Sequence, residues 1–361
     1  MNNKLKYIIV ASLLYGASGF NSAKAITADE LLVAVQQFAG QVVQAFTQVG
    51  QALGDHQARI DALNDDVNNI NNPPDSMVVN CPAESVQQAI NSVKYGLEVT
   101  IFIVGQCSES VSIIKDGITL SGNNDGDDTI DGGLTEVKIK GAQRVQIEFL
   151  ELTGAGYGVL AEEGASVTIT HSDIHDNEFD GVAAFNQVFV RVSFNTITGN
   201  GRPAPYYEAG IDAGGGATVR SRGNLFADNG YTAVEVANMS FFRSGISTGG
   251  EPPDPADLDI LLQKGCAQGQ VAGSCGDAGT IALDCFRNGV CDLRNTDVTG
   301  IIEVGRASYL DARDSIINGN VEGFDGSRLN MRNTVSGSGL VSCSGETFAS
   351  SGAVPCDGAI P

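Results

Sequence analysis

Single apolar residues recur in a fixed pattern along most of this chain. An apolar residue is followed eight positions later by another, as Ile211 is by Val219, and about seven positions further on by a third, such as Phe226. Glycine, serine or asparagine stands at the bends between them. Each unit therefore predicts three short strands with turns between them. The eight-residue pairs are Val137 and Val145, Val159 and Val167, Val182 and Val190, Ile211 and Val219, Val234 and Phe242, Ile302 and Leu310, and Val321 and Leu329; the third positions are Leu152, Ile174, Ile197, Phe226, Val298 and Ile317 or Ile316.

No unit has enough apolar surface to close a core by itself. The units recur every 19 to 29 residues, and such a period is typical of a solenoid in which neighbouring turns stack. We therefore expect Val182, Ile211 and Val234 to lie directly above one another, about 4.8 Å apart, which is the spacing of paired strands.

The start of this region resembles a known family. SVQQAI is similar to a capping helix, and VTIFIVGQCSESVSI, DGITLSGNN and TIDGG are similar to the first turns of right-handed parallel β-helix proteins of the pectin-lyase-like superfamily. The resemblance covers about Met77 to the C-terminus. It implies an all-β fold without fixing an activity, because that superfamily includes lyases, hydrolases, epimerases, esterases, phage tailspikes and noncatalytic surface proteins. A leucine-rich repeat is the rival architecture, but its asparagine-punctuated leucine signature is absent.

Before the repeats, a different periodicity predicts an α-helical rod. From Leu32 to Ile70 apolar residues are spaced by three and four, with His56 as a polar layer. An unbroken register of this length favours a coiled coil over a lone helix, and its β-branched positions favour three or four strands over two. We therefore expect a homotrimer. The Asn-Asn-Pro-Pro at 71–74 ends the helix.

The N-terminal residues have the pattern of a secretory signal peptide. Two lysines precede an apolar stretch from Tyr7 to Leu14, and Ala23 and Ala25 flank a plausible cleavage point. The apolar run is too short to span a bilayer. We expect an exported protein, in the periplasm, on the cell surface or outside the cell. The expected organisation is a signal peptide at 1–25, a coiled-coil rod at 26–72, a linker at 73–80 and a β-helix at 81–361 with an insertion at 245–279.

Export makes disulfides the default interpretation of the eight cysteines. No CxxC is present and no histidine lies near any of them, which argues against a zinc site. Spacing alone leaves the connectivity open. Proximity in sequence suggests Cys81 with Cys107, Cys266 with Cys275, Cys285 with Cys291, and Cys343 with Cys356.

The charge narrows the class of partner. The net charge is −22 at pH 7, so nucleic acid and anionic membranes should be repelled. A neutral glycan, or an anionic one held through calcium, remains compatible with this surface.

Stacking would turn equivalent outward positions into columns. One column is acidic and contains Asp212 and Glu235, and another contains Arg191, Arg220 and Arg243. Adjacent arginines repel, so we expect an anion to compensate them: either neighbouring carboxylates or a ligand. In the C-terminal half, Asp292 and Asp311 fall among Arg294, Arg313 and Arg332, which predicts a structural charge ladder.

The resemblance implies a site in the same region. In pectate-lyase-like members, carboxylates hold calcium that bridges to a uronate while a basic side chain abstracts the proton. By position this implies Asp212, Glu235 and Glu208 as calcium ligands and Arg220 or Arg222 as the base. We expect Arg191, Arg243, Arg202, Tyr206 and Tyr207 to contact the polysaccharide, since residues 201–209 lengthen the preceding connection.

Three functions remain open from the sequence. The first is a polysaccharide lyase or glycoside hydrolase acting on acidic glycans. The second is a noncatalytic trimeric adhesin or tailspike-like fibre, which the coiled-coil pattern favours. The third is a purely structural role, which explains the charge ladder but not the arginine column.

Overall fold

The computed structural model describes residues 29, 33, 36–44, 46–51, 59–60, 75–123, 128–132, 137–201, 208–245, 258–262, 281–332, 334–336, 340–343, 348–349 and 358–359. The chain divides into two units, Met1–Pro73 and Pro74–Pro361. The expected signal peptide, at 1–25, lies outside the described residues.

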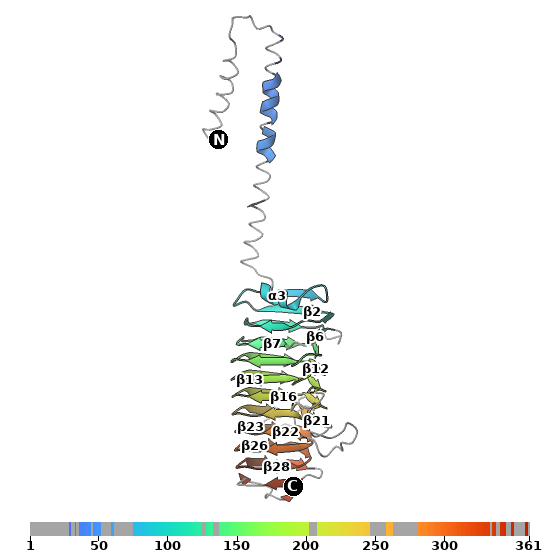
Figure 1. Cartoon of the computed structure of the whole chain (residues 1–361), viewed down its shortest axis with the longest axis vertical. Coiled ribbons are helices and arrows are strands. Elements are labelled where there is room, and N and C mark those ends of the chain that lie inside the picture. Colours follow the sequence, from blue (N-terminus) through green and yellow to red (C-terminus); the bar gives the residue numbers. More distant parts are fainter. Residues whose placement is uncertain are drawn as a thin grey trace. The chain divides into compact units, whose positions relative to one another are not determined.

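The second unit is a parallel β-solenoid whose turns stack in sequence order (Figure 1). Each complete turn contributes one strand to each of three sheets, which we name sheets A, B and C. Sheet A contains β1 Ser76–Asn80, β2 Val99–Val104, β5 Ile118–Ser121, β8 Val145–Glu148, β11 Ser166–Thr170, β14 Phe189–Ser193, β17 Thr218–Arg222, β20 Phe241–Ser244, β23 Val290–Arg294, β26 Tyr309–Arg313, β29 Arg328–Arg332 and β32 Phe348–Ala349.

The other two sheets are built in the same way. Sheet B contains β3 Gln106–Cys107, β6 Thr129–Asp131, β9 Glu151–Thr153, β12 Asp173–His175, β15 Thr196–Thr198, β18 Leu225–Ala227, β21 Asp259–Leu262, β24 Thr296–Thr299, β27 Ile316–Asn318 and β30 Val335–Ser336. Sheet C contains β4 Val111–Ile113, β7 Val137–Lys140, β10 Val159–Glu162, β13 Val182–Phe185, β16 Ala209–Gly214, β19 Thr232–Val236, β22 Ile281–Cys285, β25 Ile301–Val304, β28 Val321–Gly323, β31 Leu340–Cys343 and β33 Gly358–Ala359, the last of which is antiparallel to β31.

The apolar pattern forms the core in the register that the sequence predicts. Val182 pairs with Ile211 and Ile211 with Val234 across β13, β16 and β19, and all three side chains are fully buried. The sequence left Ile317 or Ile316 open as the inward residue of its turn. In sheet B it is Ile317 that is buried, whereas Ile316 is 47% exposed. The stacked solenoid is therefore confirmed.

The corner between sheets A and B contains a ladder of buried polar side chains. The backbone N–H of Ser172 donates to Asn195 Oδ1, that of Asn195 to Asn224 Oδ1, and that of Asn224 to Asp259 Oδ1, each at 2.9 Å. A backbone N–H that turns inward at a bend has no strand partner, and these oxygens supply one. The asparagines noticed at bends in the sequence therefore connect one turn to the next.

A short helix, α3 Val86–Ser92, lies at the N-terminal end of the solenoid (Figure 1). The Glu109 carboxylate accepts hydrogen bonds from the backbone N–H groups of Val86 (2.6 Å) and Gln87 (3.2 Å). The buried Lys115 ammonium donates to carbonyls at the other end of the helix, including that of Asn91 at 2.8 Å. Negative charge at the helix start and positive charge at its end match the helix dipole.

Two of the expected cysteine pairs are disulfides in the structure. They join Cys81 with Cys107 and Cys285 with Cys291. Cys266, Cys275 and Cys356 lie outside the described residues, and only the strand position of Cys343 is described, so those two pairings stay predictions.

The N-terminal unit is helical where it is described, at residues 29, 33, 36–44, 46–51 and 59–60. The expected coiled coil is not supported. A coiled coil needs a second helix to cover its apolar seam, whereas in this single chain Phe46 is 73% exposed and Val49 is 48% exposed. Among the described residues, no helix is long and apolar enough to cross a membrane.

Two boundaries differ from the expected ones. Ser76–Asn80, inside the range expected to be linker, forms β1 and pairs in parallel with β2, so the solenoid begins before residue 81. The 245–279 insertion contains the strand β21. This strand pairs with β18 and β24 and so adds a strand to sheet B. The apolar run Ile260–Leu262 supplies this strand without the usual eight-residue spacing.

We predict that Asn224→Ala lowers the free energy of unfolding by at least about 2 kcal/mol. The substitution removes the acceptor for the backbone N–H of Asn195, and each buried group left without a partner costs about 1 to 3 kcal/mol. Urea unfolding followed by circular dichroism measures this. Asn318→Ala, at an exposed position of β27, is the control and should change stability by less than about 0.5 kcal/mol. Equal effects of the two substitutions would show that the ladder is not stabilising.

Candidate functional site: two outer faces of the solenoid

The outward face of sheet A presents one polar side chain per turn. Register pairs Thr168 with Arg191, Arg191 with Arg220, and Arg220 with Arg243. We call the whole series the polar column. It consists of Thr100, Thr119, Gln146, Thr168, Arg191, Arg220, Arg243, Asp292, Asp311 and Asn330.

The arginines of this column differ in how they are compensated. Arg243 Nε lies 2.8 Å from Asp292 Oδ2 in the next turn. Arg191 and Arg220 are exposed, and within the described part of the chain neither forms an ion pair. Their guanidinium carbons instead lie 6.0 Å and 5.5 Å from the centroid of the Phe189 ring. The expected compensation by Asp212 and Glu235 is not observed.

A comparison of the repulsion between Arg191 and Arg220 with their cation–π contacts favours an anionic ligand at these two residues. Like charges on adjacent strands, about 5 Å apart, repel by about 1 to 3 kcal/mol between the dielectric of water and an effective value of about 20. A cation–π contact at an exposed site returns only about 0.5 to 1 kcal/mol. An anion placed between the two guanidinium groups would therefore be attracted by both.

The C-terminal half of the column is occupied by internal ion pairs, as expected. Arg294 Nη2 lies 2.9 Å from Asp292 Oδ2, and Arg313 pairs with Asp311. Both pairs form along a strand, between residues two apart. Asp292 also forms an ion pair with Arg243 of the preceding turn. This half of the column is therefore a structural charge ladder.

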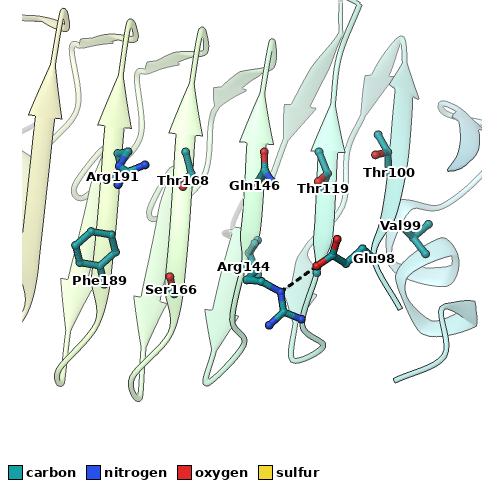
Figure 2. Close-up of a pocket in the computed structure, with 12 residues that line it drawn as sticks. Glu98, Val99, Thr100, Thr119, Arg144, Gln146, Ser166, Thr168, Phe189 and Arg191 are labelled. Atoms are coloured by element: carbon teal, nitrogen blue, oxygen red, sulfur yellow. Dashed lines mark hydrogen bonds and ion pairs between the residues drawn. The ribbon is translucent and has the colours of Figure 1, made fainter. Parts of the chain in front are cut away.

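On its N-terminal side the polar column lines a shallow groove of ≈ 460 Å³. Figure 2 shows Thr100, Thr119, Gln146 and Thr168 following one another across the strands toward Arg191. A second row on the same face contains Phe189, Ser166 and Arg144, and Arg144 Nε lies 3.1 Å from Glu98 Oε1. The groove thus offers hydroxyl and amide groups and the Arg144–Glu98 ion pair, followed by the Phe189 ring and the Arg191 guanidinium.

The outward face of sheet C carries the acidic column. Asp212 pairs with Glu235, Glu235 with Asp284, and Asp284 with Glu303. Asp284 was missing from the sequence-based series because the insertion before β22 breaks the regular spacing of the units. The column continues to Glu322 in β28.

Burial and mutual repulsion favour the protonated form of these carboxyl groups. Burial, with a smaller contribution from Glu208, raises the pKa of Asp212 to about 7. Burial and then Asp212 and Asp284 raise the pKa of Glu235 to about 8. Asp180, which accepts a hydrogen bond from the backbone N–H of Ala209 at 2.6 Å, has a pKa well above its usual range, because it is buried beside Asp212.

A second groove of ≈ 460 Å³ lies along the C-terminal part of the acidic column. The Tyr231 hydroxyl donates to Asp284 Oδ2 at 3.3 Å, and burial first, then Glu303, raises the pKa of Asp284 to about 7. Phe286, Phe324, Arg287 and Arg306 line the same groove as Tyr231, Glu235, Asp284 and Glu303. Carboxyl groups that are partly protonated near neutral pH can serve as proton donors.

The residues expected to form one calcium-lyase site do not all come together. Asp212 and Glu235 are adjacent and Glu208 lies beside Asp180, but Arg220 and Arg222 face outward from sheet A rather than sheet C. Arg222 lies against the Phe194 ring, 5.3 Å from its centroid. Neither arginine is among the charges that shift the pKa of Asp212 or Glu235. The expected contacts Arg202, Tyr206 and Tyr207 lie outside the described residues.

The geometry of the carboxylates gives calcium no ready cage. In the described ranges, the group of three potential metal ligands whose atoms lie within 4.8 Å of one another is Cys81, Cys107 and Glu109. Its two cysteines are joined in a disulfide. The oxygen donors of the acidic column are the type that calcium prefers, but no three of them converge, so calcium binding stays a prediction.

Two features of the site were not anticipated from the sequence. Asp180 precedes the strand β13 and was outside the acidic series. Phe189 and Phe241 stand two residues before Arg191 and Arg243 and face outward with them. The recurring Phe-x-Arg is the signal that could have revealed these rings, because residues two apart on a strand share a face.

Comparisons with known proteins agree with the fold. The family model for right-handed β-helix regions matches residues 101–246. The matched residues lie in the solenoid, whose strands stack in parallel, and this is the fold that the resemblance to the pectin-lyase-like superfamily implied. A solved structure titled an alginate lyase from Paenibacillus sp. str. FPU-7 aligns with 11% sequence identity, over 75% of this chain and 98% of that one, with a TM-score of 0.47. A search of curated proteins gave no significant match.

The acidic column predicts that stability falls as pH rises. Asp212, Glu235 and Asp284 have folded-state pKa values of about 7, 8 and 7, above the unfolded values near 4. Their stabilising contribution is therefore present below about pH 4 and is lost as pH rises through 7 to 8. Thermal melts at intervals from pH 5 to about pH 9 should show a falling Tm.

Glu235→Gln should flatten this dependence, and Glu163→Gln, at an exposed turn, should leave it unchanged. A Tm of the wild-type protein that rises from pH 6 to about pH 8 would contradict the assignment.

Proposed function

We propose that this protein is exported and binds a linear acidic polysaccharide on the outside of its solenoid. The observation that carries the proposal is the exposed pair Arg191 and Arg220, two adjacent cations without an ion pair among the described residues of a chain with net charge −22. An anion between the two guanidinium groups would be attracted by both of them. The hydroxyl and amide groups that precede them suit sugar hydroxyls.

The open shape of the face supports an extended ligand. The groove on sheet A crosses successive strands, so a ligand in it lies along the axis on which the turns stack (Figure 2). A polymer that repeats one unit after another matches a surface that repeats one side chain per turn. A compact small molecule would use only a fraction of such a surface.

An enzymatic form of the proposal places the chemistry on sheet C. Glu235 and Asp284 are adjacent carboxyl groups with pKa values raised to about 8 and about 7, and the Tyr231 hydroxyl donates to Asp284. A group that is protonated near neutral pH can act as the general acid of glycoside cleavage. The alternative is a noncatalytic adhesin or tailspike-like fibre, which uses the binding face alone.

We predict that the wild-type protein binds acidic polysaccharides such as polyuronates in affinity electrophoresis. Binding should weaken as salt is raised, since it rests on exposed cations. The same mixtures are then assayed for new reducing ends and for the ultraviolet absorbance of unsaturated uronate, with and without a calcium chelator. If no polysaccharide in a broad panel slows the migration of the protein, the proposed function is refuted.

Product formation that is lost in Glu235→Gln would assign the enzymatic form. Binding without product would assign the adhesin form.

Assembly through the N-terminal helix is a further part of the proposal. Its described apolar positions are exposed in the single chain, Phe46 at 73% and Val49 at 48%, and three such helices would cover them. Light scattering of the mature protein should give the mass of a trimer, and a chain beginning at Ser76 should give that of a monomer. Equal oligomeric states for the two proteins would reject this role.

A further inference from the structure

Next to the polar column, sheet A carries a second outward column in which large rings alternate with smaller residues. Register pairs Phe189 with Thr218, and Thr218 with Phe241. Val290 and Tyr309 continue the alternation in the next two turns. We call this series the aromatic column.

The two columns meet at Phe189. The Phe189 ring lies against the two arginines of the polar column that form no ion pair among the described residues, 6.0 Å from the guanidinium carbon of Arg191 and 5.5 Å from that of Arg220. The Phe241 ring lies 5.3 Å from that of Arg243, whose charge Asp292 already satisfies. A flat apolar ring beside a cation is the combination that an acidic sugar requires: its ring face stacks and its carboxylate pairs.

The charges at the two ends of the face set its limits. Toward the N-terminus the polar column continues as Thr168, Gln146 and Thr119, which are neutral donors and acceptors. Toward the C-terminus it continues as the buried carboxylates Asp292 and Asp311, which already pair with Arg243, Arg294 and Arg313, so an added anion gains little there. An acidic chain can therefore extend from Arg220 over the groove of Figure 2, but gains little by continuing past Arg243.

The period of the aromatic column gives the repeat of the ligand. Adjacent turns are separated by about 4.8 Å, so the rings of Phe189 and Phe241 recur at about 10 Å, once every two turns. One turn is close to the length of one sugar in an extended chain, and two turns to that of a disaccharide. In an extended chain with alternating ring faces, every second sugar presents the same face.

We propose that sheet A is a binding track for an extended acidic polysaccharide that is read in disaccharide steps. Every second sugar stacks on Phe189 or Phe241, and Arg191 and Arg220 bind the carboxylates. This inference rests on the proposed function and adds the class of glycan, its period and its contacts.

The test uses the full-length protein and two length series of oligosaccharides in isothermal titration calorimetry. One series is β-1,4-linked oligomannuronate and the other is the neutral β-1,4-linked mannan oligosaccharide of the same length. The acidic series should bind more tightly. Its affinity should rise in one step, when the oligosaccharide becomes long enough to stack on both Phe189 and Phe241, because the sugar between them gains no ring.

Variants then separate the contacts. Arg191→Gln and Arg220→Gln should each lower affinity for the acidic series by about tenfold or more, the size expected for a lost charge-assisted hydrogen bond. Phe189→Leu should lower affinity for both series. The matched control is Arg328→Gln, the same change of charge at an exposed position of β29, which should stay within about twofold of wild type. Circular dichroism melts confirm that each variant is folded.

The outcomes distinguish this inference from the proposed function. Failure of the wild-type protein to bind any acidic glycan refutes both. Binding of the oligomannuronate that Arg191→Gln and Arg220→Gln leave as tight as Arg328→Gln does overturns the track and leaves the function standing. Equal affinity for the acidic and neutral series overturns the charge assignment. An affinity that rises smoothly with oligosaccharide length overturns the disaccharide period.

Discussion

The structure depends on one constraint, which is that each strand pairs in parallel with the equivalent strand of the next turn in a one-to-one register. Because side chains alternate between the two faces of a strand, this register decides at once which residues are buried and which are stacked outside. Val182, Ile211 and Val234 form a buried column, and the residues that directly follow each of them form an outer one. A slip of one residue would expose the core and scatter the outer columns.

The three-sheet cross-section keeps opposite charges on separate faces. Arg191 and Arg220 point away from sheet A, whereas Asp212 and Glu235 point away from sheet C. On sheet A the exposed guanidinium groups lie against Phe189 without a carboxylate partner among the described residues. On sheet C, burial first and then repulsion between neighbouring carboxyl groups raise the pKa of Glu235 to about 8. On sheet A the repulsion between arginines ends at Asp292, where Arg243 and Arg294 find a carboxylate. The outer face of sheet A therefore contains a half with exposed, unpaired arginines, Arg191 and Arg220, and a half whose charges are paired internally.

The stacked fold could be predicted from the sequence because its signal is repeated in almost every turn. The eight-residue pairs identify the core of sheets A and C even though each pair alone would be weak. Leu261 and Leu283 escaped prediction because the insertions around β21 separate them from the preceding turn, although Leu283 and Cys291 keep the eight-residue spacing. The periodic N-terminal pattern predicted helix, which the described residues show, but association depends on other copies of the chain.

The sequence could predict which residues of the candidate site stack in one column, but not which face of the solenoid each column lies on. Sequence spacing correctly placed Arg191 with Arg220 and Asp212 with Glu235. It could not show that the two pairs face different directions, because the angle at the turn between β16 and β17 is a property of the folded chain. The role of Phe189 was missed for a related reason. An outward phenylalanine looks like a core residue until the next residue of its own strand, the buried Val190, is placed.

Disulfide trapping of the register on sheet A tests the central claim most directly. With cysteines introduced at Thr168 and Arg191, which are direct partners, mild oxidation should close a bond that peptide mapping identifies. Cysteines at Thr170 and Arg191, on the same face but two residues out of register, should remain reduced. Preferential closure of the second pair would contradict the stacking from which both outer columns follow.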